Sequence, residues 1–103
     1  MYLVREIFYC KPGKVRPLIE KFKAMSALGE KSGMPPMRLM TDMAGERYWT
    51  LVAEMEVGSI HEFETMMQNP SSSVDDQKAL EKIMDGYHEL VVEGRREFFR
   101  IET

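Results

Sequence analysis

The sequence predicts an α+β fold in which helices cover one face of a four-stranded antiparallel sheet. Two regions place apolar residues at the spacing of amphipathic helices, and four other segments have the composition or the alternation that is typical of strands. Their order along the chain is β-α-β-β-α-β, which is the split βαβ, or ferredoxin-like, arrangement. Because 103 residues is close to the commonest domain size, we expect residues 1–103 to form a single ferredoxin-like domain.

The first strand and the first helix are predicted on either side of a tight turn. Leu3 to Cys10 is rich in β-branched and aromatic residues, and Pro12-Gly13 suits the two central positions of a type II turn. The apolar stripe of the following helix consists of Val15, Leu18, Ile19, Phe22, Met25 and Leu28. Gly29 or Gly33 can end this helix.

Two strands are expected next, from Met37 to Met43 and from Arg47 to Val57, with a turn at 44–46 between them. The odd positions of the longer strand are apolar and its even positions are mixed, a period of two that predicts one packed face. We expect Trp49 to anchor the core and its neighbour Tyr48 to point to the opposite face.

The second helical region is expected in two parts. Ser59 and Glu62 have the spacing of a capping box, which predicts a short helix ending at Gln68. The asparagine, proline and serines at 69–73 should break it.

A longer helix is predicted from about residue 74 to residue 93, followed by the last strand at 95–102. Gly86 is a weak point inside this helix, at a cost of about 1 kcal/mol relative to alanine. Gly94 is the expected stop.

Charge and cysteine content exclude several classes of function. A net charge of −3 and a pI of about 5.4 provide no basic surface for nucleic acid. Cys10 is the only cysteine, so neither an internal disulfide nor a cysteine metal cluster can form. No apolar run approaches the ~20 residues that span a bilayer, and Arg5 and Glu6 interrupt the stretch that a signal peptide would need to keep apolar. We therefore expect a cytoplasmic protein with neither a membrane nor a nucleic-acid partner.

Ten methionines raise the question of a metal site, because four of them are spaced by three residues from Met34 to Met43. In a strand, a step of three puts neighbouring side chains ~10 Å apart and on opposite faces. Such thioethers cannot converge on one soft ion. We predict that the methionines fill space and that the protein holds no metal and no cofactor.

Alternation along the strands assigns side chains to the two faces of the sheet. The helix-covered face is predicted to hold Trp49, Leu51, Ala53, Met55, Phe99 and Ile101. The open face is predicted to hold Arg38, Met40, Tyr48, Thr50, Val52, Glu54, Phe98 and Arg100. The first strand is apolar on both sides, so its open side is left undecided. Because monomers rarely expose large apolar patches, we expect a homodimer with the open faces together about a two-fold axis.

Charged residues on that face must be paired if the dimer buries them. Two interpretations stay open: either Glu54 pairs with Arg38 or Arg100, or these groups fix a polar ligand. The candidate ligand-binding residues are Arg38, Tyr48, Thr50, Glu54, His61 and Arg100.

His61 and His88 lie off the apolar stripes of their predicted helices, which is typical of solvated histidines. Cys10 ends a strand beside Lys11, a cation that could lower a thiol pKa. A lone cysteine at a strand end is nevertheless more often a small hydrophobic residue.

Two short motifs resemble the dimeric α+β barrel superfamily and, within it, the NIPSNAP-like proteins. They are FYCKPGK at 8–14, followed directly by the amphipathic helix, and EGRRE at 93–97. Family members usually carry an arginine in the first strand, where this sequence has Glu6 at the matching position and Arg5 beside it. The superfamily includes cofactor-independent monooxygenases such as those of antibiotic biosynthesis, haem-degrading enzymes, muconolactone-isomerase-like enzymes and proteins without known activity. The resemblance therefore implies a fold and a dimer without choosing the chemistry.

Two functions of different classes are consistent with the sequence. The favoured one is a homodimer that holds a small apolar or aromatic ligand between its sheets or is purely structural, because the sequence offers no nucleophile–base pair. The alternative is a cofactor-independent monooxygenase or isomerase acting on an aromatic or polyketide-like substrate. In that case Arg38 or Arg100 would stabilise an enolate, while Tyr48 or His61 would move a proton.

Overall fold

The computed structural model describes residues 1–68 and 73–103. Its elements are β1 (Tyr2–Cys10), α1 (Val15–Lys31), β2 (Arg38–Thr41), β3 (Thr50–Val57), α2 (Ile60–Gln68), α3 (Val74–Met84), the 3₁₀ helix η1 (Tyr87–Glu89) and β4 (Val91–Arg100). The break predicted at 69–73 lies outside the described residues except for Ser73, whose hydroxyl accepts a hydrogen bond from the amide of Asp76 and caps α3.

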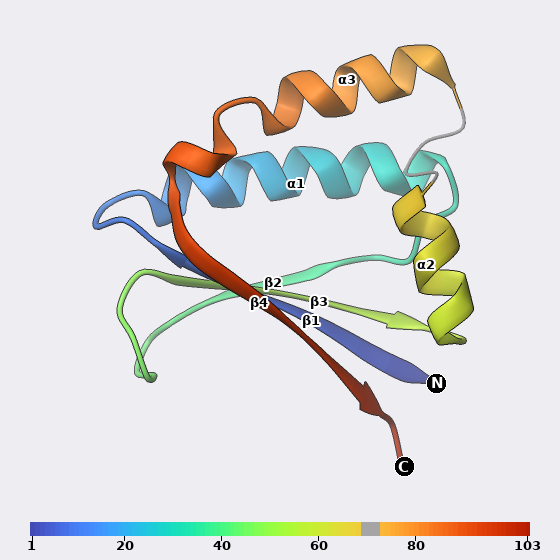
Figure 1. The fold of residues 1–103 in the computed structure, drawn as a ribbon, viewed down its shortest axis with the longest axis horizontal. Coiled ribbons are helices and arrows are strands. Elements are labelled where there is room, and N and C mark those ends of the chain that lie inside the picture. The colour runs from blue at the N-terminus through green and yellow to red at the C-terminus, as the bar shows by residue number, and fades with distance from the viewer. Residues whose placement is uncertain (69–72) are drawn as a thin grey trace.

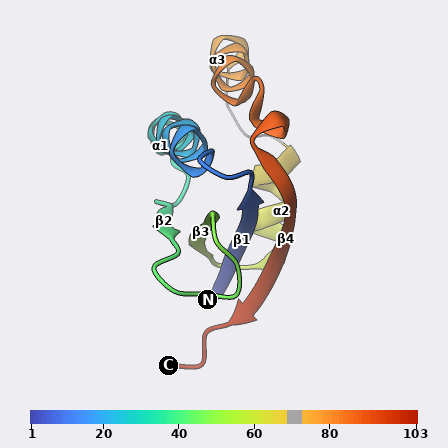
Figure 2. The same cartoon turned by 90° about the vertical axis from the view of Figure 1, so that its left-hand side faces the viewer.

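The four strands form one antiparallel sheet in the order β2-β3-β1-β4. The helices all lie on one side of this sheet, while the other side is free of described helices (Figure 1). The predicted α+β class and the predicted order of elements are confirmed. Figure 2 shows that α1 lies next to the sheet and α3 beyond it.

Beneath α1, the predicted apolar stripe forms the larger part of the core. Leu18, Ile19 and Phe22 pack on Cys10 and Leu51, and Leu18 and Leu51 are each 0% exposed. Burial raises the pKa of the Cys10 thiol, which is the opposite of the shift that a reactive cysteine needs. Cys10 is therefore a core residue.

A second cluster lies under α2, where Phe63 packs on Val4 and Val57. The capping box that begins this helix is present, since the Ser59 hydroxyl accepts a hydrogen bond from the amide of Glu62 at 3.0 Å. The Glu62 carboxylate accepts in turn from the Gly58 amide at 2.7 Å. These contacts fix α2 at one end of the sheet.

The helix α3 has no buried residue and ends earlier than predicted. Gly86 takes a left-handed conformation with φ of 79°, so it ends the helical run where the sequence had suggested only a weak point. Lys21 of α1 donates hydrogen bonds to the carbonyls of Ile83 and Asp85 at 3.0 and 2.6 Å. These bonds satisfy carbonyl groups that the end of the helix leaves free.

The early end of α3 lets β4 begin at Val91, so Gly94 lies inside the strand and the prediction that it stops a helix is wrong. Gly94 is opposite Phe8 in β1. A Cβ atom at this position would lie 3.2 Å from the Phe8 ring, which shows how closely that ring covers the backbone.

The predicted faces of β4 are also reversed. Phe98 is opposite Val4 and meets the ring of Phe63 edge-on at 5.1 Å, so it lies on the helix-covered face. Phe99 lies on the open face, with the guanidinium of Arg5 at 5.2 Å from its ring. Two adjacent phenylalanines fit either face by composition, and only the pairing of β4 with β1 decides between them.

The predicted strand at 47–57 begins three residues late, at Thr50. Trp49 has a positive φ of 59°, and its carbonyl accepts a hydrogen bond from the Cys10 amide at 2.8 Å. Its side chain is 44% exposed and that of Tyr48 is 85% exposed. The prediction that Trp49 anchors the core is therefore wrong, and the side chain of Tyr48 is exposed to solvent.

The methionines after the two prolines do not converge. Met37 packs on the core under α1, Met40 lies on the open face, and Met43 is 99% exposed. Among the described residues, no group of three or more histidine, cysteine or acidic side chains could hold a metal ion. In the same residues, no helix has the length and apolar character needed to cross a membrane. The cytoplasmic location stays a prediction.

Candidate functional site

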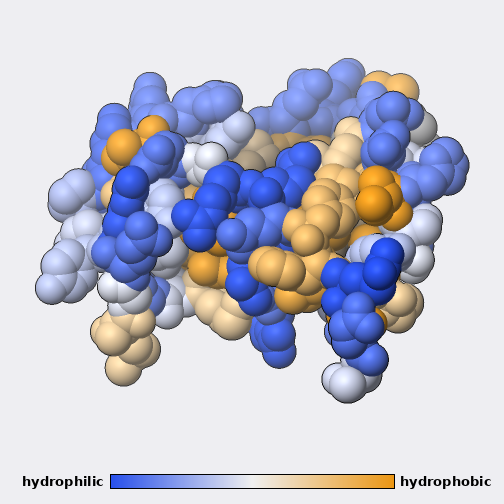
Figure 3. Space-filling model, turned by 60° about the horizontal axis from the view of Figure 1, so that its bottom comes forward, coloured by the Kyte–Doolittle hydropathy of each residue, from blue (hydrophilic) through white to orange (hydrophobic). Residues whose placement is uncertain are grey.

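The open face of the sheet is built from alternate residues of all four strands, and the register settles which side of β1 belongs to it. Its side chains are Leu3, Arg5, Ile7 and Tyr9 of β1, Thr50, Val52, Glu54 and Glu56 of β3, Glu93, Arg95, Glu97 and Phe99 of β4, and Arg38 and Met40 of β2. Figure 3 shows this face, with hydrophilic residues gathered beside a hydrophobic band.

Glu54 is the most deeply buried charge on the open face, at 6% exposure. Its two carboxylate oxygens accept hydrogen bonds from Arg38 Nη2 and Arg5 Nε, both at 2.7 Å. The hydrogen bond from Arg38 lowers the pKa of Glu54, the bond from Arg5 lowers it further, and burial opposes both. Glu54 is therefore held as a carboxylate, which suits an anchor for two arginines better than a general base.

A hollow of about 390 Å³ lies on one side of this ion-pair group. Ile7, Val52 and Met40 form its apolar part, and the segment between β2 and β3 forms one wall. Thr50 fixes that wall because its amide donates to Asp42 Oδ1 at 2.8 Å and its hydroxyl donates to the carbonyl of Arg47 at 3.0 Å. The volume is within the usual range for small-molecule sites.

Tyr9 lies at the end of this hollow that is nearest Thr50. Its hydroxyl accepts a hydrogen bond from Arg95 Nη1 at 2.8 Å. The guanidinium carbon of Arg47 lies 4.2 Å from the centre of its ring, a cation–π geometry. Although no described helix covers it, Tyr9 is only 8% exposed.

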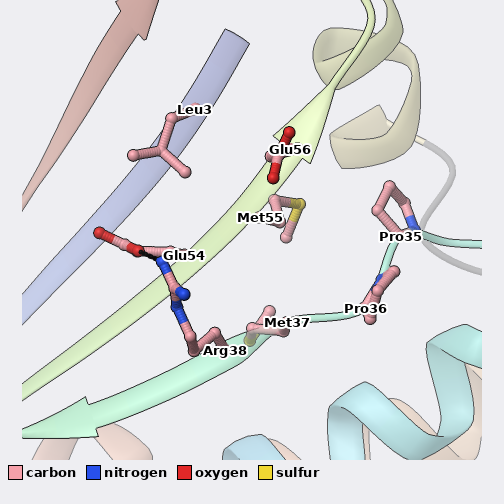
Figure 4. Close-up of a pocket in the computed structure, with 8 residues that line it drawn as sticks. All are labelled: Leu3, Pro35, Pro36, Met37, Arg38, Glu54, Met55 and Glu56. Carbon is pink, nitrogen blue, oxygen red and sulfur yellow. Dashed lines mark hydrogen bonds and ion pairs between the residues drawn. The ribbon is translucent and has the colours of Figure 1, made fainter. Parts of the chain in front are cut away.

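A smaller hollow of about 260 Å³ lies on the other side of Glu54. Figure 4 shows Arg38 and Glu54 facing each other beside Leu3, with Pro35 and Pro36 across the opening. Arg38 is 73% exposed here. Glu54 thus borders both hollows.

The predicted site residues divide into two groups. Arg38, Thr50 and Glu54 lie together on the open face, and the predicted pair of Glu54 with Arg38 is confirmed. The other three predicted residues lie away from that face or away from the hollows, as follows.

Tyr48 is exposed outside β3, and His61 is exposed on α2, across the sheet. Arg100 is opposite Tyr2, on the helix-covered face, so the alternative pair of Glu54 with Arg100 is wrong. The larger hollow does contain a tyrosine and an arginine, but they are Tyr9 and Arg95 and not the predicted Tyr48 and Arg100.

Sequence reasoning missed Arg5, Tyr9 and Arg95. The available signal was the arginine in the first strand: Arg5 faces the open side, whereas Glu6 faces the other way and pairs with Arg96. Once Arg5 is placed on the open face, period-two alternation places Tyr9 there as well.

Comparison with known proteins identifies the fold. Neither a protein-family model nor a curated protein matches this sequence. An uncharacterized NIPSNAP domain protein from Burkholderia xenovorans superposes with a TM-score of 0.73 at 12% identity, over 98% of this chain and 94% of its own. A protein from Nitrosomonas europaea assigned as an antibiotic biosynthesis monooxygenase superposes with a TM-score of 0.71 at 7% identity, over 100% of both chains.

A variant of SnoaB, a cofactor-independent oxygenase from Streptomyces nogalater, superposes with a TM-score of 0.63 at 13% identity, over 99% of this chain and 93% of its own. This chain has the subunit fold of the dimeric α+β barrel proteins. The predicted resemblance to NIPSNAP and antibiotic-biosynthesis-monooxygenase structures is thereby confirmed at the level of the fold. Identities this low carry no activity from one protein to the other.

Proposed function

We propose that two copies of this chain pack with their open faces together and that the space between the sheets binds a small apolar or aromatic molecule. The observation that carries the proposal is the hollow of about 390 Å³, whose apolar part opens on the side of the sheet that no described helix covers. A second sheet over it would shield the half-buried Val52 and Met40 from water.

The surface area of the chain supports a dimer. A compact monomer of 12.0 kDa is expected to expose roughly 6,000 Å², whereas this chain exposes 7009 Å². The excess of about 1,000 Å² is similar to the ~800 Å² that each partner buries in a standard interface.

Apart from the exposed Glu56, the charges on the open face are already paired within the chain, which is compatible with such an interface. Arg5 bonds to Glu54 and lies 3.7 Å from Glu97, and Arg95 lies 3.3 Å from the same Glu97. Closing a second sheet over paired charges leaves no isolated ion to be desolvated.

A pair of matched variants tests the dimer. Val52→Arg places a charge at the centre of the proposed interface, and Val92→Arg places the same charge on β4, where the valine is 63% exposed. We expect sedimentation velocity at micromolar concentration to give a dimer for the natural protein and for Val92→Arg, and a monomer for Val52→Arg. A natural protein that sediments as a folded monomer would contradict the proposal.

Ligand binding is tested on the same proteins with 1-naphthamide, a neutral aromatic probe, by isothermal titration calorimetry. The natural dimer should bind one or two molecules per dimer, and the Val52→Arg monomer should bind none. If the dimer forms but binds no aromatic probe, a purely structural dimer is the function that stands.

A second candidate function, oxygenation without a cofactor, is favoured by one observation. The Tyr9 hydroxyl accepts its hydrogen bond from Arg95, so it can still donate its own proton within the hollow. SnoaB, which has the same fold, is a cofactor-independent oxygenase. An electron-rich phenol in this site would itself supply the four electrons that reduce O₂, with one oxygen atom entering the ring as a quinone carbonyl in place of hydrogen and the other leaving as water.

Oxygen uptake tests this second function. The chelator-treated dimer is mixed with 1,5-dihydroxynaphthalene, and O₂ consumption is compared with the uncatalysed rate and with the Val52→Arg monomer. A rate no higher than these two controls would exclude the activity for this class of phenol.

A further inference from the structure

Three polar side chains meet at one end of the larger hollow, where they come from three separate parts of the chain. Tyr9 belongs to β1, Arg95 to β4, and Arg47 to the segment between β2 and β3. Arg95 Nη1 donates to the Tyr9 hydroxyl at 2.8 Å, and the guanidinium carbon of Arg47 lies 4.2 Å from the centre of the Tyr9 ring. Side chains from such distant positions converge here only because the strands pair.

This cluster has hydrogen-bond donors to spare. A guanidinium has five N–H groups, and a tyrosine hydroxyl that accepts one hydrogen bond can still donate another. Arg95 donates Nε to Glu97 and Nη1 to Tyr9, and Arg47 donates Nη1 to Glu93. No other hydrogen bond of these two guanidiniums is formed among residues 1–68 and 73–103.

All of the nearby carboxylates except Glu46 already have a hydrogen-bond or ion-pair partner. Glu97 lies within ion-pair distance of Arg95 and Arg5, Glu93 pairs with Arg47, and Asp42 accepts from the amide of Thr50. Glu46, which also lines the hollow, acts on Arg95 only through its charge. The remaining N–H groups of the arginines and the Tyr9 proton are therefore the free donors at this end.

The apolar part of the hollow begins next to the cluster, on the same two strands. Ile7 and Val52 are cross-strand partners, and Tyr9 and Thr50 are the partners two positions along the same two strands. Two residues of strand span about 7 Å, so the apolar residues and the polar cluster are neighbours within one hollow.

Resting on the function proposed above, we infer that the Tyr9–Arg47–Arg95 cluster is a subsite for an oxyanion carried by an aromatic ring, such as an aromatic carboxylate or a phenolate. The ring lies on Ile7, Val52 and Met40. The oxyanion accepts the Tyr9 proton and one or more guanidinium N–H groups, which are charge-assisted hydrogen bonds.

A pair of probes with the same ring tests this subsite. Calorimetric titration of the dimer compares 1-naphthoate with the neutral 1-naphthamide. We expect naphthoate to bind about tenfold more tightly, because hydrogen bonds between charged partners are stronger than those to an amide.

Three variants locate the preference. Tyr9→Phe removes one hydroxyl and keeps the ring under Arg47, and Arg95→Met removes the guanidinium. Each should weaken naphthoate about tenfold and naphthamide by much less, so that the preference for naphthoate shrinks. Arg100→Met is the matched control, because it removes the same charge from the same strand on the helix-covered face, and it should change neither affinity. Sedimentation confirms that each variant is still a dimer.

The outcomes separate the two proposals. Equal binding of both probes, or an equal loss of naphthoate affinity in Arg100→Met, would overturn the oxyanion subsite and leave the proposed ligand-binding dimer standing. If neither probe binds, both the oxyanion subsite and the proposed ligand binding are overturned.

Discussion

Each face of the sheet contains side chains that are nearly closed to water, but different groups cover them. On the helix-covered face, Leu51 is 0% exposed beneath α1. On the open face no described helix is present, yet Tyr9 is 8% exposed because the side chains of Arg47 and Arg95 lie against it. Leu51 is covered by apolar packing and Tyr9 by arginines.

This difference has a functional consequence. Apolar packing under a helix is close to crystal density, so it leaves no room for another molecule. Arginine side chains cover a surface with flexible apolar stems and keep charged ends available. The open face is therefore the one on which the proposed partner sheet or ligand would bind.

The largest expected effect separates two adjacent residues of β3. Leu51→Ala, on the covered face, should lower the free energy of unfolding by about 3 kcal/mol, because it empties a fully buried position. Val52→Ala, on the half-buried open face, should cost only about 1 kcal/mol. Urea denaturation followed by circular dichroism measures both, and equal losses would show that the two faces are packed alike.

The next effect concerns the buried charge of the open face. Glu54→Gln should lower the free energy of unfolding by about 2 kcal/mol at neutral pH, because Arg5 and Arg38 lose a charged hydrogen-bond acceptor. Glu56→Gln, on the same face but exposed, is the control and should change stability by less than about 0.5 kcal/mol. A Glu54→Gln variant as stable as this control would mean that the ion pairs contribute nothing.

The effect of Glu54→Gln should also depend on pH in a defined direction. The pKa of Glu54 is lowered in the folded chain, so its stabilising contribution is present above the unfolded glutamate value of about 4.3. It is lost as the pH falls through the lower folded value. The difference in unfolding free energy between the natural protein and Glu54→Gln should therefore shrink in acid, and a difference that grows in acid would contradict the assignment.

The smallest effect compares the two arginines that share Glu54. Both donate at 2.7 Å, but Arg38 is 73% exposed and Arg5 is 35% exposed. Because water screens the exposed pair, Arg38→Met should cost little stability. Arg5→Met should cost more, since it also removes the cation–π contact with Phe99. Chemical denaturation of both variants checks the order, and a larger loss for Arg38→Met would reverse it.

Strands with a clean alternation were predictable, and strands with apolar residues on both faces were not. In β3, the expected faces of Leu51, Val52 and Glu54 are confirmed. In β4, the adjacent Phe98 and Phe99 gave no preference, and the predicted faces are wrong. The start of β4 could not be predicted either. It depends on the left-handed conformation of Gly86, which ends the helical run, and on the path by which η1 and β4 return to the sheet.

The candidate site was predictable to the same extent. Arg38, Thr50 and Glu54 follow from the alternation of β2 and β3. The prediction for Tyr48 is wrong because Trp49 leaves the strand conformation, and its carbonyl accepts a hydrogen bond from the Cys10 amide. No local pattern in the sequence contains this long-range contact.

The sequence by itself determined the number, type and order of the elements, because the periods of apolar residues are local properties of the chain. Only the tertiary structure decided which side of β1 and β4 is open, and therefore that Arg5, Tyr9 and Arg95 face the same space. A side chain in a strand changes face with every one-residue shift, and the register that fixes it is set by partners far away in the sequence.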